Sequence, residues 1–182
     1  RRWRSLLQLL PDNGHIISGD IRIDGESMVG LSRKELLRRR WRDISMVFQG
    51  AMNAWNPVYT VGDQIREALR LHWPTRLTHQ EETDRIVALF EMVGLNSAMI
   101  DRYPHEFSGG MRQRAIIAMA LSCNPKLIVA DEPTTALDVI VQDQILKELK
   151  AVQEELGMSI VYISHDIAVV AYSPFGSGRF PP

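Results

Sequence analysis

Residues 127–133 read Leu-Ile-Val-Ala-Asp-Glu-Pro, a short apolar run that ends in two adjacent carboxylates and a proline. Continuous rather than alternating apolar residues are typical of a strand in a parallel sheet whose two faces are covered by helices. A helical pattern follows as far as Gly157, and residues 159–163 then form a second apolar run of strand length. A strand, a helix and a strand in this order predict a parallel pair within an α/β fold.

The earlier part of the chain predicts an antiparallel patch, another core strand and a group of helices. In residues 19–25, apolar residues alternate with polar ones and end in Asp-Gly, which indicates a half-buried strand closed by a tight turn. Residues 44–48 form another apolar run. Two helical patterns lie between residues 61 and 106, and the second begins with a capping box formed by Thr78 and Glu81. We therefore expect an α/β core interrupted by a helical insertion.

Composition limits the partners and the location of the protein. The chain has 182 residues, and its 21 lysines and arginines nearly balance 22 aspartates and glutamates. This balance gives no support to nucleic acid or an anionic membrane as the main partner. The single cysteine, Cys123, cannot form an internal disulfide, which is consistent with the cytoplasm. No apolar run approaches the roughly 20 residues that cross a bilayer, so we expect membrane association only through a partner.

Asp131 and Glu132 lie where the apolar run ends. Ligands of open α/β sheets bind outside the carboxyl ends of the strands, so this pair of carboxylates would face a ligand. In a site that hydrolyses phosphate bonds, the first carboxylate can hold Mg²⁺ while the second orients or deprotonates the attacking water. The alternative interpretation is a strand that simply ends in polar residues.

Ser108, Gly109 and Gly110 open a predicted helix that extends to about Cys123. A hydroxyl group, two residues without side chains and the free N–H groups at the positive end of a helix dipole would together favour an anion. The alternative is a serine N-cap followed by two loop glycines. The residues predict an anion-binding surface that contains no lysine.

Three segments, in this order and spacing, resemble the ABC transporter ATPase family. They are Phe-Ser-Gly-Gly-Met-Arg-Gln-Arg at 107–114, Ala-Asp-Glu-Pro-Thr-Thr-Ala-Leu-Asp at 130–138, and Ser-His-Asp at 164–166. The amino-acid sequences of residues 48–57 and 103–107 are further similar to the peptide, oligopeptide and nickel importer branch of that family. This resemblance implies a P-loop NTPase-like parallel sheet core that uses ATP and Mg²⁺.

The resemblance also implies a role for each matching residue. Asp131 matches the acid associated with Mg²⁺, and Glu132 matches the catalytic base. His165 matches the switch histidine that contacts the γ-phosphate, although a lone histidine after a strand can also serve as a cap or in packing. Gln49 matches the glutamine that senses the metal and the membrane partner. The residues expected to contact the nucleotide are Gln49, Ser108, Gly109, Gly110, Gln113 and Asp138.

In this family the signature loop, Ser108 to Gly110 here, binds the γ-phosphate of a nucleotide held by the opposite subunit, so the resemblance implies dimerisation. The family's phosphate-binding loop, Gly-x-x-x-x-Gly-Lys-Ser/Thr, does not occur among the 182 residues. We therefore expect an incomplete domain that is inactive alone. The expected division is a partial nucleotide-binding core with the antiparallel patch (1–60), the helical insertion (61–106), the core with signature, acidic pair and switch histidine (107–172), and an atypical tail (173–182).

Three functional hypotheses follow from the resemblance. The leading one is a fragment of the ATP-hydrolysing subunit of an ABC importer that energises uptake of peptides or similar solutes. It would sit on the cytoplasmic face of the inner (plasma) membrane, bound to transmembrane permease subunits and to a second ATPase subunit, identical or different. The second is a non-catalytic, degenerate subunit that gives its signature loop and coupling surface to a complete partner. The third, a DNA-repair type of ABC ATPase, is disfavoured because sustained heptads are absent and no nucleic-acid partner is expected.

Overall fold

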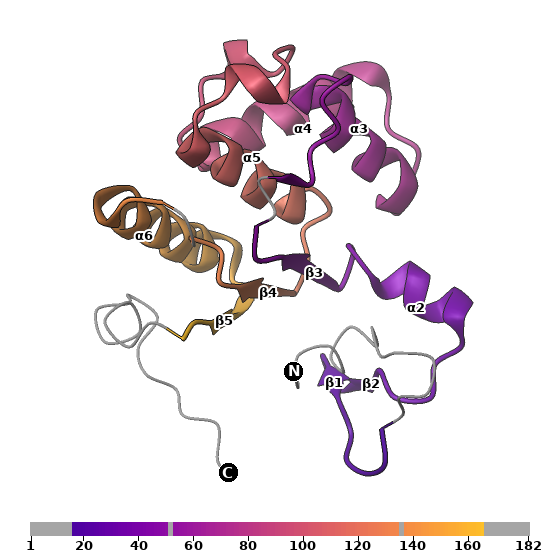
Figure 1. Cartoon of the computed structure of the whole chain (residues 1–182). Coiled ribbons are helices and arrows are strands. Elements are labelled where there is room, and N and C mark those ends of the chain that lie inside the picture. The colour runs from indigo at the N-terminus through magenta and orange to yellow at the C-terminus, as the bar shows by residue number, and fades with distance from the viewer. Residues whose placement is uncertain (1–15, 51–52, 135–136, 166–182) are drawn as a thin grey trace.

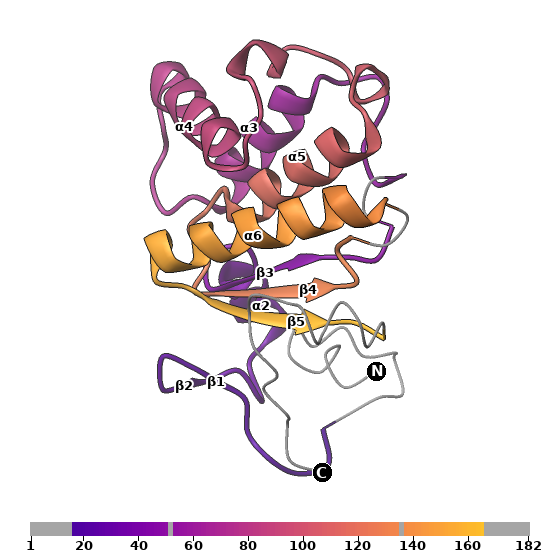
Figure 2. The same ribbon diagram turned by 90° about the vertical axis from the view of Figure 1, so that its left-hand side faces the viewer.

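Three parallel strands form the centre of the α/β fold in the computed structural model, which describes residues 16–50, 53–134 and 137–165. They are β3 (Ile44–Val47), β4 (Leu127–Asp131) and β5 (Ser159–Ile163), and β4 lies between the other two. Val47 is the register partner of Ala130, and Asp131 is the partner of Ile163. All three carboxyl ends therefore meet at one edge of the sheet, as Figure 2 shows.

Helices and a short hairpin surround this sheet (Figure 1). The hairpin joins β1 (Arg22–Ile23) to β2 (Glu26–Ser27) through Asp24 and Gly25, both of which have positive φ, as a tight hairpin turn requires. The antiparallel patch expected near the start is thus confirmed. The helices are α2 (Arg33–Arg39), α3 (Val61–His72), α4 (His79–Met92), α5 (Gly109–Leu121) and α6 (Val139–Leu156), with short 3₁₀ turns η2 (Ser97–Met99) and η3 (Pro104–Glu106).

The helices begin where their capping residues predict. The Thr78 and Glu81 side chains form the expected capping box at the start of α4. Ser108 caps α5, and Gly157, with a left-handed φ of 62°, ends α6. These ends are encoded locally, because each depends on a side chain or a glycine within a few residues.

Residues alternate along the strands between two apolar clusters. Val47 and Ile128 face the larger cluster, which is built from α3 to α6. Ile44 and Val129 face a smaller cluster on the opposite side. That smaller cluster also contains Ile23, Met28 and Leu36 from the hairpin segment and α2. Within the described residues, the short helix α2 and buried side chains of the hairpin segment cover this second face.

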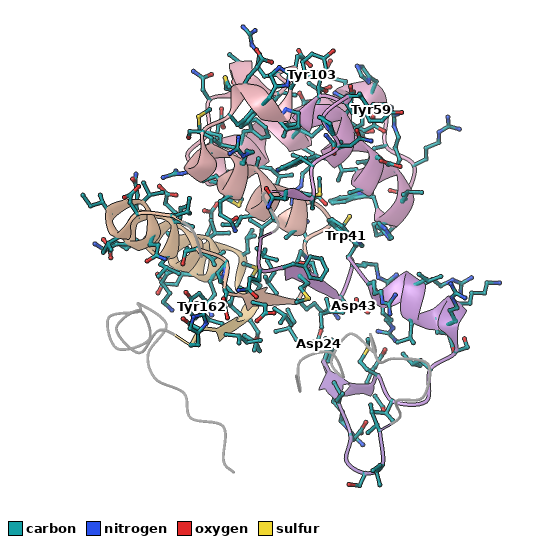
Figure 3. All side chains as sticks on the ribbon, viewed as in Figure 1. Asp24, Trp41, Asp43, Tyr59, Tyr103 and Tyr162 are labelled. Carbon is teal, nitrogen blue, oxygen red and sulfur yellow. The ribbon has the colours of Figure 1, made fainter. Side chains whose placement is uncertain are left out.

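The helical insertion packs as one layer with α5 above α6 (Figure 1). Gly62 lies against Ile100, and the Gly62 N–H donates to the Ile100 carbonyl over 2.8 Å. A Cβ at Gly62 would collide with Ile100. Trp41, which has a φ of 70°, stacks on His72 of α3 with ring centroids 5.6 Å apart (Figure 3). The first contact holds the insertion together, and the second anchors it to the core.

Several expectations lie outside the described residues. They include the atypical tail at 173–182 and Asp166, the last residue of the Ser-His-Asp segment. The division into 1–60, 61–106, 107–172 and 173–182 remains a prediction. Among the described helices, none combines the length and the apolar character needed to cross a bilayer.

Candidate functional site

The carboxyl edge of the sheet brings Gln49, Glu132 and His165 together. Gln49 Nε2 donates to Glu132 Oε2 over 2.5 Å, and His165 Nδ1 lies 2.6 Å from Glu132 Oε1. Gln49 and His165 are 83 and 33 positions from Glu132 in the sequence, so only the adjacency of the three strands unites them. The segment that follows each strand thus supplies one side chain to the cluster.

The main chain also fixes Glu132. Its N–H donates to the Ile163 carbonyl of β5 over 2.8 Å, and its φ of 51° lies in the left-handed region. A residue with a side chain in that region costs on the order of 1–3 kcal/mol, which persists only where surrounding contacts enforce it. The Glu132 side chain is 9% exposed, whereas that of His165 is 77% exposed. The carboxylate is therefore held in a fixed, largely covered position.

Asp131, the last residue of β4, is 3% exposed and lies beside this cluster in the sequence. No group of three or more His, Cys, Asp or Glu side chains in the described part of the chain could hold a metal ion. Mg²⁺ does not need such a cage, because it is usually held by one or two carboxylates together with water and substrate phosphates. An aspartate and an amide oxygen are hard donors of the kind that Mg²⁺ prefers. Asp131 and Gln49 fit this chemistry, and their role as metal ligands remains a prediction.

A second group of predicted residues lies at the N-termini of α5 and α6. Ser108 Oγ accepts a hydrogen bond from the Met111 N–H over 3.3 Å, and Asp138 Oδ1 accepts one from the Val141 N–H over 2.9 Å. A Cβ on Gly110 would lie 2.9 Å from Val141 Cγ1, so glycine permits α5 to approach α6 closely. The two helix N-termini are therefore neighbours. Helix N-termini carry partial positive charge and free N–H groups, which suits an anion such as phosphate.

Gln113 joins neither group. Its side chain lies within α5 and is 2% exposed, and its Nε2 has no hydrogen-bond partner within residues 16–50, 53–134 and 137–165. A nucleotide contact by Gln113 remains a prediction, and in this conformation the amide does not reach the surface.

The helical insertion contains a separate cavity of about 960 Å³, lined by residues 69–70, 73–79 and 82. None of the predicted site residues lines it. Beside it, both carboxylate oxygens of the buried Glu82 accept hydrogen bonds from Arg70, at 2.7 and 2.8 Å. The Arg70 hydrogen bonds hold the pKa of Glu82 below its usual value. This ion pair supports the wall of the insertion and lies apart from the sheet edge.

Two contacts of the site were missed by reasoning from the sequence. One is the approach of Gly110 to Val141, and the other is the bond from the Glu132 N–H to the Ile163 carbonyl. Both join segments that are distant in the sequence. For the approach of Gly110 to Val141, the only sequence signal was a glycine at the start of a helix. The bond between the Glu132 N–H and the Ile163 carbonyl has no sequence signal, because it joins main-chain atoms.

A family model described as "ABC transporter" matches residues 5–135, which is most of the chain. The chain belongs to the ABC transporter family. The resemblance carried by residues 107–114 and 130–138 is thereby confirmed. The assignment of Ser108 to Gly110 to the signature loop, and of Asp131 and Glu132 to the acidic pair, remains a prediction.

Three relatives within this family have names that refer to the transport or import of oligopeptides, peptides or glutathione. The chain is 44% identical over 171 residues to the oligopeptide transport ATP-binding protein OppD of Bacillus subtilis. It is 46% identical over 175 residues to a putative peptide import ATP-binding protein of Brucella ovis, and 43% identical to the glutathione import ATP-binding protein GsiA of Salmonella choleraesuis. These alignments cover 92% of this chain and 47%, 51% and 28% of the three relatives, so the chain spans about half the length of the first two. The expected similarity to the peptide-importer branch is confirmed.

Solved ABC transporter structures share the fold. The dimeric ATP-binding cassette MJ0796, in a post-hydrolysis state with ADP and Pi, has a TM-score of 0.73 and 32% identity, over 86% of this chain and 67% of the other. The cassette cbiO1 of Clostridium perfringens, part of the transporter complex cbiONQ, has a TM-score of 0.76 and 27% identity, over 93% of this chain and 63% of the other. The expected α/β architecture with a parallel core is confirmed.

Proposed function

We propose that this chain carries the hydrolytic edge of the ATPase subunit of an ABC importer that takes up peptides or similar solutes. The observation that carries the proposal is Glu132, whose carboxylate is held between Gln49 and His165 where three parallel strands end. The names of the relatives, which import oligopeptides, peptides and glutathione, support the choice of solute.

In this proposal Glu132 is the general base. Its carboxylate accepts a proton from a water molecule as that water attacks the γ-phosphate of ATP, a role worth roughly 10²–10⁴ in rate. His165 is exposed enough to reach a phosphate oxygen. Asp131 and Gln49 would hold Mg²⁺, which neutralises charge on the phosphates when it is bound. Burial of Asp131 at the strand end keeps its carboxylate in a fixed place.

The helix N-termini serve a second subunit. Ser108, Gly109 and Gly110 would face the γ-phosphate of a nucleotide held by the opposite subunit, with Asp138 at the subunit interface. The adjacent Val139 and Ile140 are 79% and 81% exposed, and an exposed apolar pair at that position suits contact with another protein surface. The solved dimer of MJ0796 supports this arrangement. Permease subunits would hold the pair at the cytoplasmic face of the inner (plasma) membrane.

One other candidate would use only the helix N-termini of α5 and α6: a non-catalytic subunit that lends its signature loop to a complete partner. The Glu132→Gln variant separates the two in the transporter purified with this chain as its ATPase subunit. If the chain is catalytic, the rate of ATP-dependent phosphate release falls by at least about 100-fold. If the chain only lends its loop, Glu132→Gln leaves the rate unchanged while Ser108→Arg lowers it.

The isolated 182-residue chain provides a second test. We expect no measurable affinity for Mg-ATP by calorimetry, because the signature loop and the acidic edge supply only part of a phosphate cage. Tight binding by this chain would contradict the need for a phosphate-binding loop.

A further inference from the structure

The side-chain amide of Gln49 faces Glu132 with its NH₂ group. An ionised carboxylate only accepts hydrogen bonds, so the donor of the 2.5 Å contact to Glu132 Oε2 must be the Gln49 NH₂ group. The amide oxygen therefore points elsewhere. Among the residues that the structure describes, no hydrogen bond to Gln49 Oε1 is found. The side chain thus offers its donor end to the base and directs its oxygen away from that carboxylate.

Strand register explains why these two residues meet. Val47 of β3 is paired with Ala130 of β4, and Gln49 and Glu132 each follow two residues later. Both residues lie just beyond the ends of two paired strands, at the same edge of the sheet. The core pairing therefore brings the two residues close together.

We propose that Gln49 is a positioning residue that orients Glu132 through its NH₂ group. This inference rests on the proposed ATPase function and adds to it a role for the donor end of Gln49. Rotation of the carboxylate is restrained at one oxygen by Gln49 and at the other by His165, while the Ile163 carbonyl holds its main chain. Loss of Gln49 removes the hydrogen bond at Oε2, and the His165 side chain on the other oxygen is 77% exposed and so is little confined by packing.

A charge at position 49 separates this role from that of a metal ligand. Gln49→Glu keeps an oxygen that could bind a cation, but it places a second carboxylate at hydrogen-bonding distance from Glu132. The two like charges repel and turn Glu132 away. Gln49→Ala removes the donor and the oxygen without adding a charge. A positioning role therefore predicts that Gln49→Glu is at least as harmful as Gln49→Ala, whereas a metal ligand alone predicts the reverse order.

The kinetic test uses the transporter purified with this chain as its ATPase subunit. We expect Gln49→Glu to lower kcat by about 30-fold or more and Gln49→Ala by about tenfold, within the range assigned to a general base. The KM for ATP should change by less than about threefold in both variants, because the lost interaction acts on the transition state. Gln64→Ala, which alters a glutamine bonded to the carbonyls of Asn56 and Tyr59, is the matched control. Greater activity for Gln49→Glu than for Gln49→Ala would overturn the proposal.

The second test does not depend on hydrolysis. In an NMR spectrum of the ¹⁵N-labelled 182-residue chain, the chemical shifts of the Gln49 side-chain NH₂ group should differ from those of an exposed glutamine. The reason is that one of its protons is hydrogen-bonded to the Glu132 carboxylate. Glu132→Ala should return them to the exposed position and leave those of Gln64 unchanged. If the Gln49 signals do not respond to Glu132→Ala, the positioning role is wrong even when the transporter hydrolyses ATP. If they respond but no hydrolysis occurs, the contact stands, and the proposed function, with the catalytic role built on it, is wrong.

Discussion

The edge of the sheet and the N-termini of α5 and α6 are assembled in different ways. At the edge, Glu132 is joined to Gln49 and His165 by side-chain contacts across 83 and 33 positions of sequence. At the helix N-termini, Ser108 and Asp138 each bond to an N–H three residues ahead. The edge is therefore a tertiary structure whose members support one another, and the helix N-termini are local structures brought close by one glycine.

This difference indicates separate duties. A carboxylate restrained on two sides and mostly covered is suited to a step that needs accurate placement, such as proton transfer from water. Two exposed helix N-termini with small residues are suited to meet a group carried by another molecule. Changes at the sheet edge should therefore abolish the proton-transfer step, whereas changes at the helix N-termini should weaken binding of the group carried by the other molecule.

The largest effect is expected at the edge, from Glu132→Gln. This nearly isosteric change removes the base but keeps an oxygen that can accept the hydrogen bond from Gln49. We expect phosphate release to fall by about 10²–10⁴-fold while the melting temperature stays within a few degrees. Asp143→Asn, which breaks an exposed ion pair with Lys147 on α6, is the control and should leave the rate unchanged.

A smaller effect is expected from Gly110→Ala at the helix N-termini. The new methyl group would lie 2.9 Å from Val141 Cγ1, so either the Val141 side chain or α5 must shift, and a displacement of an ångström can cost up to about 100-fold in rate. We expect a fall in phosphate release of about tenfold without loss of stability, because alanine favours a helix more than glycine does. Gly110→Ala combined with Val141→Ala should recover most of the rate. No recovery would mean that the contact with Val141 is not what glycine serves.

Glu82→Gln alters neither region and tests whether the insertion is independent of both. Loss of the charge paired with Arg70 should lower the free energy of unfolding by about 2 kcal/mol at pH 7, measured by urea denaturation. Since the pKa of Glu82 is lowered in the folded protein, its contribution is present above the unfolded pKa, near 4.5, and is lost as pH falls through the folded pKa. Wild type and variant should therefore converge in strong acid. A constant difference down to pH 2 would contradict the ion-pair explanation.

The smallest effect on stability is expected from Ser108→Ala. The cap bond to the Met111 N–H is long, so its loss should cost about 0.5–1 kcal/mol in the free energy of unfolding. Ser108→Thr keeps a hydroxyl and should retain most of that stability. A loss above 2 kcal/mol would show that Ser108 does more than cap α5 in the free chain.

Local features were predictable from the sequence and tertiary contacts were not. The capping box of Thr78 and Glu81 and the stop at Gly157 depend on neighbours in the chain, and the structure confirms both. The strands were predictable from apolar runs, but no sequence pattern gives the order β3-β4-β5 that unites the edge. The stack of Trp41 on His72 likewise joins distant segments. Burial of Gln113 depends on which face of α5 meets the core, and its charged and polar neighbours gave no sign of it.

The most direct test of the two duties is complementation within a dimer that contains two copies of this chain, isolated with two different affinity tags. One copy carries Glu132→Gln and the other carries Ser108→Arg. If the edge of one subunit works with the helix N-termini of the other, this dimer retains one intact site and about half of the wild-type rate of phosphate release. A dimer with both changes in the same copy then retains almost none. The opposite result, with activity kept only when both changes share one copy, would contradict the account.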